Sequence, residues 1–174
     1  MLNGVAPAPT VFTAKGTTKA GAVVDLLNGS WEIDRLDLGS INASTGAFTA
    51  SGLVGGTGKI KYSYGGSTGT TSATIKLHFT SEPQPIDPSI KGQFGTAGQA
   101  DPAMSLLYPY DKTVFPRGLL GPTLQWNGGS AADIYYLHAT SPTFEYEAWA
   151  AVPPPSRYDL PAEVWKKLRS EEHT

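Results

Sequence analysis

The longest run of alternating apolar and polar side chains in this sequence covers residues 31–79. In KIKYSY, for example, Ile60, Tyr62 and Tyr64 fall on one parity, and Lys59, Lys61 and Ser63 fall on the other. Clusters of Gly, Asn and Ser interrupt the alternation every few residues. This pattern is typical of short, half-buried strands joined by tight turns. It predicts an antiparallel β-sandwich whose core contains Trp31, Ile60, Tyr62 or Tyr64, and Ile75.

Two turns divide this stretch. Ile41 and Phe48 flank the polar segment 42–46, which predicts a short hairpin. Gly65 and Gly66 follow the KIKYSY strand and precede a second alternating run over residues 72–79. Glycine pairs tolerate the positive φ angles of tight hairpin turns, so these two runs are expected to pair.

The order of these segments resembles the second half of a bacterial immunoglobulin-like domain of the BIG2 type. A tryptophan strand precedes GSINASTGAFTASGLVGG, TGKIKYSYGG and TSATIKL. The positions that match the family pattern are Gly46, Phe48, Gly52, Gly58, Ile60, Tyr64, Gly65 and Gly66. The resemblance covers about residues 8–80. It implies an Ig-like sandwich for a first domain, residues 1–80.

Residues 81–103 are rich in Pro, Gly, Ser and Gln and show no period. Such a composition predicts a linker. Ile90 and Phe94 are its candidate anchors to a neighbouring domain. A long structureless loop is uncommon inside a compact domain, so a domain boundary is expected here.

Residues 104–174 are expected to form a second β-unit. The spacings P-x-D-x-x-x-x-P, P-x-L-x-W and A-x-x-Y-x-L resemble the opening strands of fibronectin type III-like modules. In this interpretation Trp126 and Tyr136 belong to the core, together with Phe144 and the residues of its parity. The predicted fold class is therefore all-β, with two antiparallel Ig-like or fibronectin-like sandwiches.

One helix is predicted, over residues 161–171. Pro161 suits the first helical position, and Leu160, Val164, Trp165 and Leu168 form an apolar stripe. The strands that should close a fibronectin-like sandwich are missing after this point. The second unit is thus expected to be truncated, or to be completed by another chain or by the first domain. The helix is expected to dock on the second unit.

Composition limits the function classes. The chain has 174 residues, of which 40% are hydrophobic and 16% charged, with 20 Gly and 14 Pro. Its formal charge of −2 provides no basic field for nucleic acid, so no nucleic-acid partner is expected. The absence of Cys excludes disulfides, thiolate catalysis and Cys-based metal sites.

No apolar run approaches the roughly 18 to 20 residues that span a bilayer, so no membrane span is expected. The opening MLNGVAPAP also lacks the basic and apolar parts of a signal peptide. We interpret the chain as a piece of a longer exported protein, located outside the cell or in the cell envelope. A cytoplasmic protein is the alternative.

The sequence offers little catalytic apparatus. His78, His138 and His173 are each alone in their local sequence, and no phosphate-binding or nucleophile motif occurs. Among Asp111, Asp133, Glu145 and Glu147, only the last two share a strand face, about 7 Å apart by strand rise. Alternation places this pair on the solvent side. No catalytic residue and no metal ligand are therefore predicted, and the chain is not expected to be an enzyme.

Calcium is the one cofactor considered, because bacterial Ig-like repeats sometimes carry it. The candidate oxygen ligands are Asp34, Asp37 and Asn42, or Asp101 and Asp111. None of them lies in the D-x-D-x-D-G loop of a strong calcium signal. They are interpreted as ordinary turn residues, and no cofactor is predicted.

Aromatic residues are dense between positions 108 and 149. Tyr and Trp combine a flat apolar ring with a polar group, which suits contacts with sugars and proteins. The predicted ligand-binding residues are Tyr108, Tyr110, Tyr135 and Trp149. Tyr135 and Trp149 are included because their parity places them opposite the expected core.

These observations predict that the chain is a non-catalytic module that acts as a spacer, adhesion or recognition domain. Its expected partner is a protein or a polysaccharide at the cell surface. The alternative is a carbohydrate-binding or accessory region of a secreted hydrolase.

Overall fold

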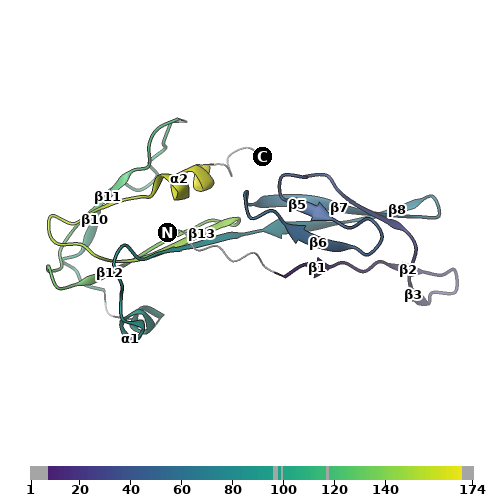
Figure 1. The fold of residues 1–174 in the computed structure, drawn as a ribbon, viewed down its shortest axis with the longest axis horizontal. Helices are drawn as coiled ribbons and strands as arrows, with labels where there is room; N and C mark the ends of the chain where they lie inside the picture. Colours follow the sequence, from purple (N-terminus) through teal and green to yellow (C-terminus); the bar gives the residue numbers. More distant parts are fainter. Residues whose placement is uncertain (1–7, 96–97, 99, 117, 170–174) are drawn as a thin grey trace. The chain divides into compact units, whose positions relative to one another are not determined.

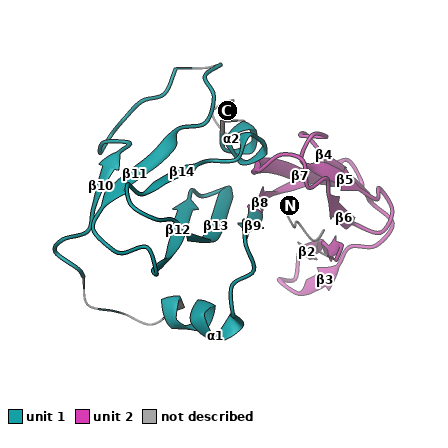
Figure 2. Cartoon of the chain, turned by 60° about the vertical axis from the view of Figure 1, so that its left-hand side comes forward, with its two compact units in different colours: residues 1–3, 78–174 teal, residues 4–77 magenta. Residues whose placement is uncertain are grey.

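The computed structural model describes residues 8–95, 98, 100–116 and 118–169 (Figure 1). The chain divides between Leu77 and His78 into two compact units, coloured separately in Figure 2. We call residues 8–77 the N-terminal unit and residues 78–169 the C-terminal unit. Strands make up 44% of the residues and helices 9%, which confirms the all-β class.

The N-terminal unit consists of antiparallel sheets in the orders β1-β6-β5, β2-β3 and β4-β7-β8. Its strands are β1 (Thr10–Val11), β2 (Lys15–Thr17), β3 (Val23–Asp25), β4 (Ser30–Ile33), β5 (Gly39–Ile41), β6 (Ala47–Ala50), β7 (Gly56–Tyr64) and β8 (Ser67–Ile75). Ile41 lies opposite Phe48, as the predicted hairpin requires. The Gly65–Gly66 turn joins β7 to β8, and both of its glycines have positive φ angles of 54° and 81°.

The core of this unit confirms most of the predicted positions. Trp31, Ile33, Phe48, Ile60 and Tyr62 form one buried cluster, and Ile75 packs against it. The Trp31 and Tyr62 rings lie 4.5 Å apart. The Tyr62 hydroxyl donates to the carbonyl of Leu26 at 2.9 Å. Tyr64 shares their parity but is 46% exposed, because it lies at the end of β7, beside the turn.

The C-terminal unit contains two three-stranded antiparallel sheets, in the orders β12-β13-β9 and β10-β11-β14. Its elements are β9 (Leu77–Ser81), α1 (Pro88–Lys91), the 3-10 helix η1 (Gly92–Gly95), β10 (Ser105–Tyr108), β11 (Thr123–Asn127), β12 (Ile134–Thr140), β13 (Phe144–Ala151), β14 (Arg157–Asp159) and α2 (Ala162–Arg169). Leu77, the last residue of the N-terminal unit, begins β9.

Two contacts show that these sheets face each other. The Trp126 ring of β11 meets Tyr135 of β12 at 4.9 Å, nearly edge to face. The buried hydroxyls of Tyr146 on β13 and Tyr158 on β14 are hydrogen-bonded at 2.7 Å. Burial raises the pKa of Tyr146, so its hydroxyl stays protonated near neutral pH. The faces that carry these side chains form the core of the unit.

The segment 81–103, predicted as a linker, is instead part of the C-terminal unit. Asp87 caps α1 by accepting from the backbone N–H of Ser89 at 2.8 Å, and Pro88 begins the helix. Ile86 is buried, and the Phe94 ring lies 5.6 Å from that of Tyr136. Apolar residues spaced four apart thus anchor a segment whose composition alone suggested a loop. Residues 96, 97 and 99 lie outside the described residues.

Helix α2 covers residues 162–169 of the predicted range 161–171, and residues 170 and 171 lie outside the described part. Pro161 precedes the helix, and its carbonyl accepts the first helical hydrogen bond, from the N–H of Trp165 at 2.9 Å. Val164 and Trp165 are buried. The Trp165 indole contacts Phe115 and donates to the carbonyl of Leu119, which confirms that the helix docks on the C-terminal unit.

Candidate functional site

The outer face of the β12-β13-β9 sheet gathers ionisable and aromatic side chains. The β12–β13 register sets Tyr136 opposite Trp149 and His138 opposite Glu147. Residues directly opposite in an antiparallel pair share a face, and alternation turns this face away from the buried Tyr146 and its neighbours. We use the name outer face for the cluster formed by His78, Tyr136, His138, Glu145, Glu147 and Trp149.

Hydrogen bonds link the polar half of the outer face. The Tyr136 hydroxyl donates to Oε1 of Glu147, and Nε2 of His78 lies 2.6 Å from Oε2 of the same carboxylate. Nε2 of His138 lies 3.0 Å from Oε1 of Glu145. The side chains of His78 and His138 are 52% and 38% exposed, so this half is accessible to a ligand.

The protonation states of Glu147 and Tyr136 follow from this arrangement. The hydroxyl of Tyr136, and then His78, lower the pKa of Glu147 by hydrogen bonding to its ionised form. Burial, together with the Glu147 carboxylate, raises the pKa of Tyr136 to about 12. Near neutral pH, Glu147 is therefore an acceptor and Tyr136 a donor.

Aromatic rings form the other half of the outer face. Tyr136 lies 5.2 Å from Trp149 and stacks on His138 at 5.7 Å, with an interplanar angle of 19°. Nζ of Lys91, in α1, lies 5.6 Å from the Trp149 ring centroid and is ion-paired with Glu82. The α1–η1 segment thus lies against the aromatic half, and the imidazole and carboxylate groups remain the open half.

The lowered pKa of Glu147 predicts an acid-dependent loss of stability. A depressed carboxylate pKa contributes stability above the usual value of 4.5, and this contribution is lost as the pH falls through the folded-state pKa. We expect Glu147→Gln to lower the free energy of unfolding of the C-terminal unit at pH 7. Below pH 4.5 the free energy of unfolding of this variant should decrease less steeply than that of the wild type. Denaturant titrations at several pH values measure both effects. Glu163→Gln, an exposed change on α2, is the control, and an unchanged acid dependence in Glu147→Gln would contradict the prediction.

Of the predicted binding residues, Trp149 lies on the outer face, whereas the prediction for Tyr135 is wrong. Tyr135 is only 6% exposed and packs against Trp126. The alternation in β12 correctly predicts that Tyr135 and Tyr136 lie on opposite faces, but the predicted core face, that of Tyr136, is the wrong one. The reason is that Tyr135 lies opposite the buried Ala150, whereas Tyr136 lies opposite Trp149.

Tyr108 and Tyr110 do not join this surface. They lie in β10 and in the loop that follows it, in the sheet opposite that of Trp149. Their rings meet edge to face at 6.1 Å, and Tyr110 is 73% exposed. Tyr110 and Asp111 line a shallow pocket of about 490 Å³ with Leu106 and Pro109. The four predicted residues therefore do not form a single site.

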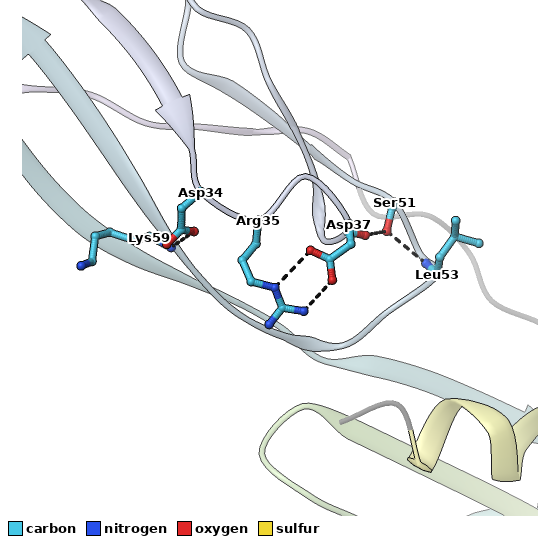
Figure 3. A network of polar contacts seen from close by, with 6 residues as sticks. All are labelled: Asp34, Arg35, Asp37, Ser51, Leu53 and Lys59. Atoms are coloured by element: carbon cyan, nitrogen blue, oxygen red, sulfur yellow. Dashed lines mark hydrogen bonds and ion pairs between the residues drawn. The ribbon is translucent and has the colours of Figure 1, made fainter. Parts of the chain in front are cut away.

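The calcium candidates of the N-terminal unit are held in turns, as Figure 3 shows for Asp34 and Asp37. Arg35 donates to both carboxylate oxygens of Asp37, at 3.1 and 2.5 Å, and lowers its pKa. Oδ1 of Asp34 accepts from the N–H of Lys59 at 2.7 Å. Oδ1 of Asn42 accepts from the N–H groups of Ser44 and Thr45. The Asp37 and Asn42 oxygens thus stabilise local turns, and the Asp34 carboxylate ties the end of β4 to β7.

The remaining candidates are also local. Asp101 accepts from the N–H of Ala103 at 2.8 Å, and Asp133 accepts from the N–H of Ser130 at 2.6 Å. His173 lies outside the described residues. Within residues 8–95, 98, 100–116 and 118–169, no group of three or more His, Asp or Glu side chains is arranged to hold a metal ion.

Three contributors to this surface were not assigned to it from the sequence: His78, Lys91 and Phe94. His78 alternates with the buried Leu77 and Phe79, which is a visible signal that it faces outward, but its pairing with Glu147 depends on which strand lies beside β9. Lys91 and Phe94 lie in the segment predicted as a linker. The four-residue spacing of the apolar residues Ile86, Ile90 and Phe94 was the sequence signal that this segment is anchored to the C-terminal unit.

Protein-family models, curated proteins and solved structures yield no significant match to this chain. The resemblances to BIG2-type and fibronectin-like modules therefore stay predictions. None of the described helices has the length and apolar character needed to cross a membrane.

Proposed function

We propose that this chain is a non-catalytic recognition module of a longer exported bacterial protein, and that it binds a polysaccharide through the outer face. The observation that carries the proposal is the juxtaposition of the Tyr136 and Trp149 rings with two imidazole–carboxylate pairs on one sheet face. The extracellular setting and the role of the N-terminal unit as a spacer rest only on the resemblance to bacterial surface modules.

A saccharide suits this chemistry because each sugar ring has apolar C–H faces and a rim of hydroxyl groups. The exposed His138 ring, which stacks on Tyr136 beside the open half, can contact an apolar face, and the carboxylates and imidazoles can hydrogen-bond the hydroxyls. Each carboxylate oxygen of Glu147 has one hydrogen-bond partner, Tyr136 or His78. An ionised carboxylate can accept about four hydrogen bonds in total. A ligand hydroxyl therefore has acceptors at this site without displacing Tyr136 or His78.

The same groups argue against Glu147 as the general acid of a glycoside hydrolysis. Hydrolysis by two carboxyl groups needs one of them to be protonated as a general acid, with a raised pKa. The pKa of Glu147 is lowered instead, so this residue is unsuited to the acid role. Tyr136, with a pKa of about 12, is likewise a fixed hydrogen-bond donor near neutral pH.

We expect Trp149→Ala to weaken polysaccharide binding at least tenfold, which corresponds to about 1.4 kcal/mol. Affinity electrophoresis and pull-down with hydroxyethylcellulose, xylan, chitin and peptidoglycan identify the ligand and measure the loss. Trp149 is partly buried, so His138→Ala provides a second variant on the exposed polar half, with the same expected direction.

Tyr110→Ala is the matched control, because Tyr110 is an exposed aromatic residue in the other sheet region of the same unit. It should leave binding unchanged. The proposal is overturned if none of the four polysaccharides binds, or if Tyr110→Ala weakens binding as much as Trp149→Ala.

A further inference from the structure

Among the described strands, none pairs with one edge of β8 in the N-terminal unit, along its whole length. Strand β8 covers nine residues, Ser67–Ile75, and lies at the end of the β4-β7-β8 sheet. Its other edge pairs with β7 from Tyr64↔Ser67 to Gly56↔Ile75 without a register shift. Within the described part of the chain, no strand pairs with the outer edge of β8. A long row of backbone N–H and C=O groups therefore faces outward.

The sequence of β8, STGTTSATI, contains none of the features that usually prevent edge-to-edge pairing. Free edges are commonly protected by charged side chains, Pro, bulges or short strand length. β8 has no charged residue, no Pro and no bulge. By contrast, the edge strand β10 has only four residues and an irregular register between Leu106 and Tyr108.

There is also open space beside the inner face of β8. A groove of about 610 Å³ lies between β2 and the first half of β8. Its lining includes the buried core residues Trp31, Ile60 and Tyr62. A Cβ atom placed on Gly69 would meet no atom within 4 Å. The space at the Cβ position of Gly69 is therefore empty, and a strand added to the edge of β8 would lie beside this groove.

We propose that β8 pairs with β8 of a second copy of this chain, in an antiparallel, two-fold symmetric arrangement. The two three-stranded β4-β7-β8 sheets would join into one continuous sheet across the two-fold axis. Such an isologous contact is self-complementary and closes at the dimer. The occupant of the free edge is thus a copy of the same strand.

The composition of β8 favours a second copy. Because β8 carries no charge, pairing it with itself brings no like charges together. The outward side chains are all hydroxyls, from Thr68, Thr70, Ser72 and Thr74, and cross-strand Thr–Thr and Thr–Ser pairs stabilise sheets. The chain already forms one such pair, since the hydroxyls of Thr57 and Thr74 lie 2.9 Å apart.

The test is the mass in solution, measured by light scattering after size exclusion and by sedimentation. We expect the wild-type chain to associate, with concentration, to twice its mass of 18.4 kDa. The double variant Thr70→Glu/Ser72→Glu should remain at 18.4 kDa. Within one chain the two changes lie opposite Lys61 and Lys59, so they are compatible with the fold, which circular dichroism verifies.

A charge-swap experiment makes the contact specific. For this experiment the positions are Thr68 and Thr74, which lie opposite the neutral residues Ser63 and Thr57 within one chain. Thr68→Glu/Thr74→Glu and Thr68→Lys/Thr74→Lys should each be monomeric alone, and an equimolar mixture of the two should recover the doubled mass. Thr140→Lys, on the free edge of β12 and opposite Glu145, is the control and should leave the dimer intact. A wild type that stays monomeric at every concentration, a mixture that fails to associate, or a dimer dissociated by Thr140→Lys would each overturn the proposal. Association with an added extended peptide but not with itself would also overturn it and would identify β8 as a peptide-binding edge.

Discussion

Replacing Ile60 with alanine is expected to lower the free energy of unfolding of the N-terminal unit by about 2 to 5 kcal/mol. Ile60 lies in the middle of β7, is 1% exposed and belongs to the cluster of Trp31, Ile33, Phe48 and Tyr62. Truncating its side chain removes buried methyl and methylene groups and leaves a cavity that aromatic neighbours fill poorly. The cost therefore combines the lost transfer free energy with the cavity term.

Hydrogen exchange followed by mass spectrometry measures this effect separately for each unit, which matters because the two units need not unfold together. Lys59→Ala is the matched control on the same strand, because Lys59 is exposed on the opposite face. It should change stability by no more than about 0.5 kcal/mol. A loss below that value in Ile60→Ala would show that β7 does not anchor the core.

The regular parts of the fold were predictable from the sequence because they depend on nearest-neighbour alternation. The parity of Ile60 and Tyr62, the hairpin between Ile41 and Phe48, and the apolar stripe of α2 each follow from spacing alone. Local turn chemistry adds the Gly65–Gly66 connection, where positive φ angles favour residues without a Cβ. These features involve residues that are close in the sequence.

The errors arose where a choice depended on long-range packing. In β12 both parities carry apolar residues, and a strand of this kind gives no sequence signal for which face meets the opposite sheet. Trp126, from the opposite sheet, and Ala150, from the neighbouring strand, bury Tyr135 and leave Tyr136 on the outer face. The same limit applies to the His78–Glu147 pair, whose members are 69 residues apart.

The segment 81–103 shows a different limit, since its composition suggested a linker. Composition averages over a window and hides three apolar side chains spaced four apart, Ile86, Ile90 and Phe94. The burial of Ile86 and the Phe94–Tyr136 contact fix this segment to the C-terminal unit. Because Lys91 lies between these anchors, the same segment places a cation against Trp149 in the candidate site.

The largest effect in the C-terminal unit is expected from Trp165→Ala. Helix α2 has only eight residues, and an isolated helix of this length is unstable in water, so its formation depends on docking. Trp165 is the principal contact, because it is 6% exposed and meets the Phe115 ring edge to face at 5.2 Å. Its Nε1 also donates to the carbonyl of Leu119 at 2.9 Å.

Removing the indole is expected to lower the free energy of unfolding of the C-terminal unit by about 3 to 5 kcal/mol. Trp165→Phe separates the two contributions, since it keeps an aromatic ring beside Phe115 but loses the N–H donor. It should cost less than Trp165→Ala, with a hydrogen-bond term of about 1 kcal/mol.

Lys166→Ala, on the exposed side of the same helix, should stay within about 0.5 kcal/mol of the wild type. Denaturant titrations and hydrogen exchange of β13 report these losses. If exchange in β13 is as slow in Trp165→Ala as in the wild type, α2 does not stabilise the sheet, and its apolar stripe becomes a candidate surface for another partner.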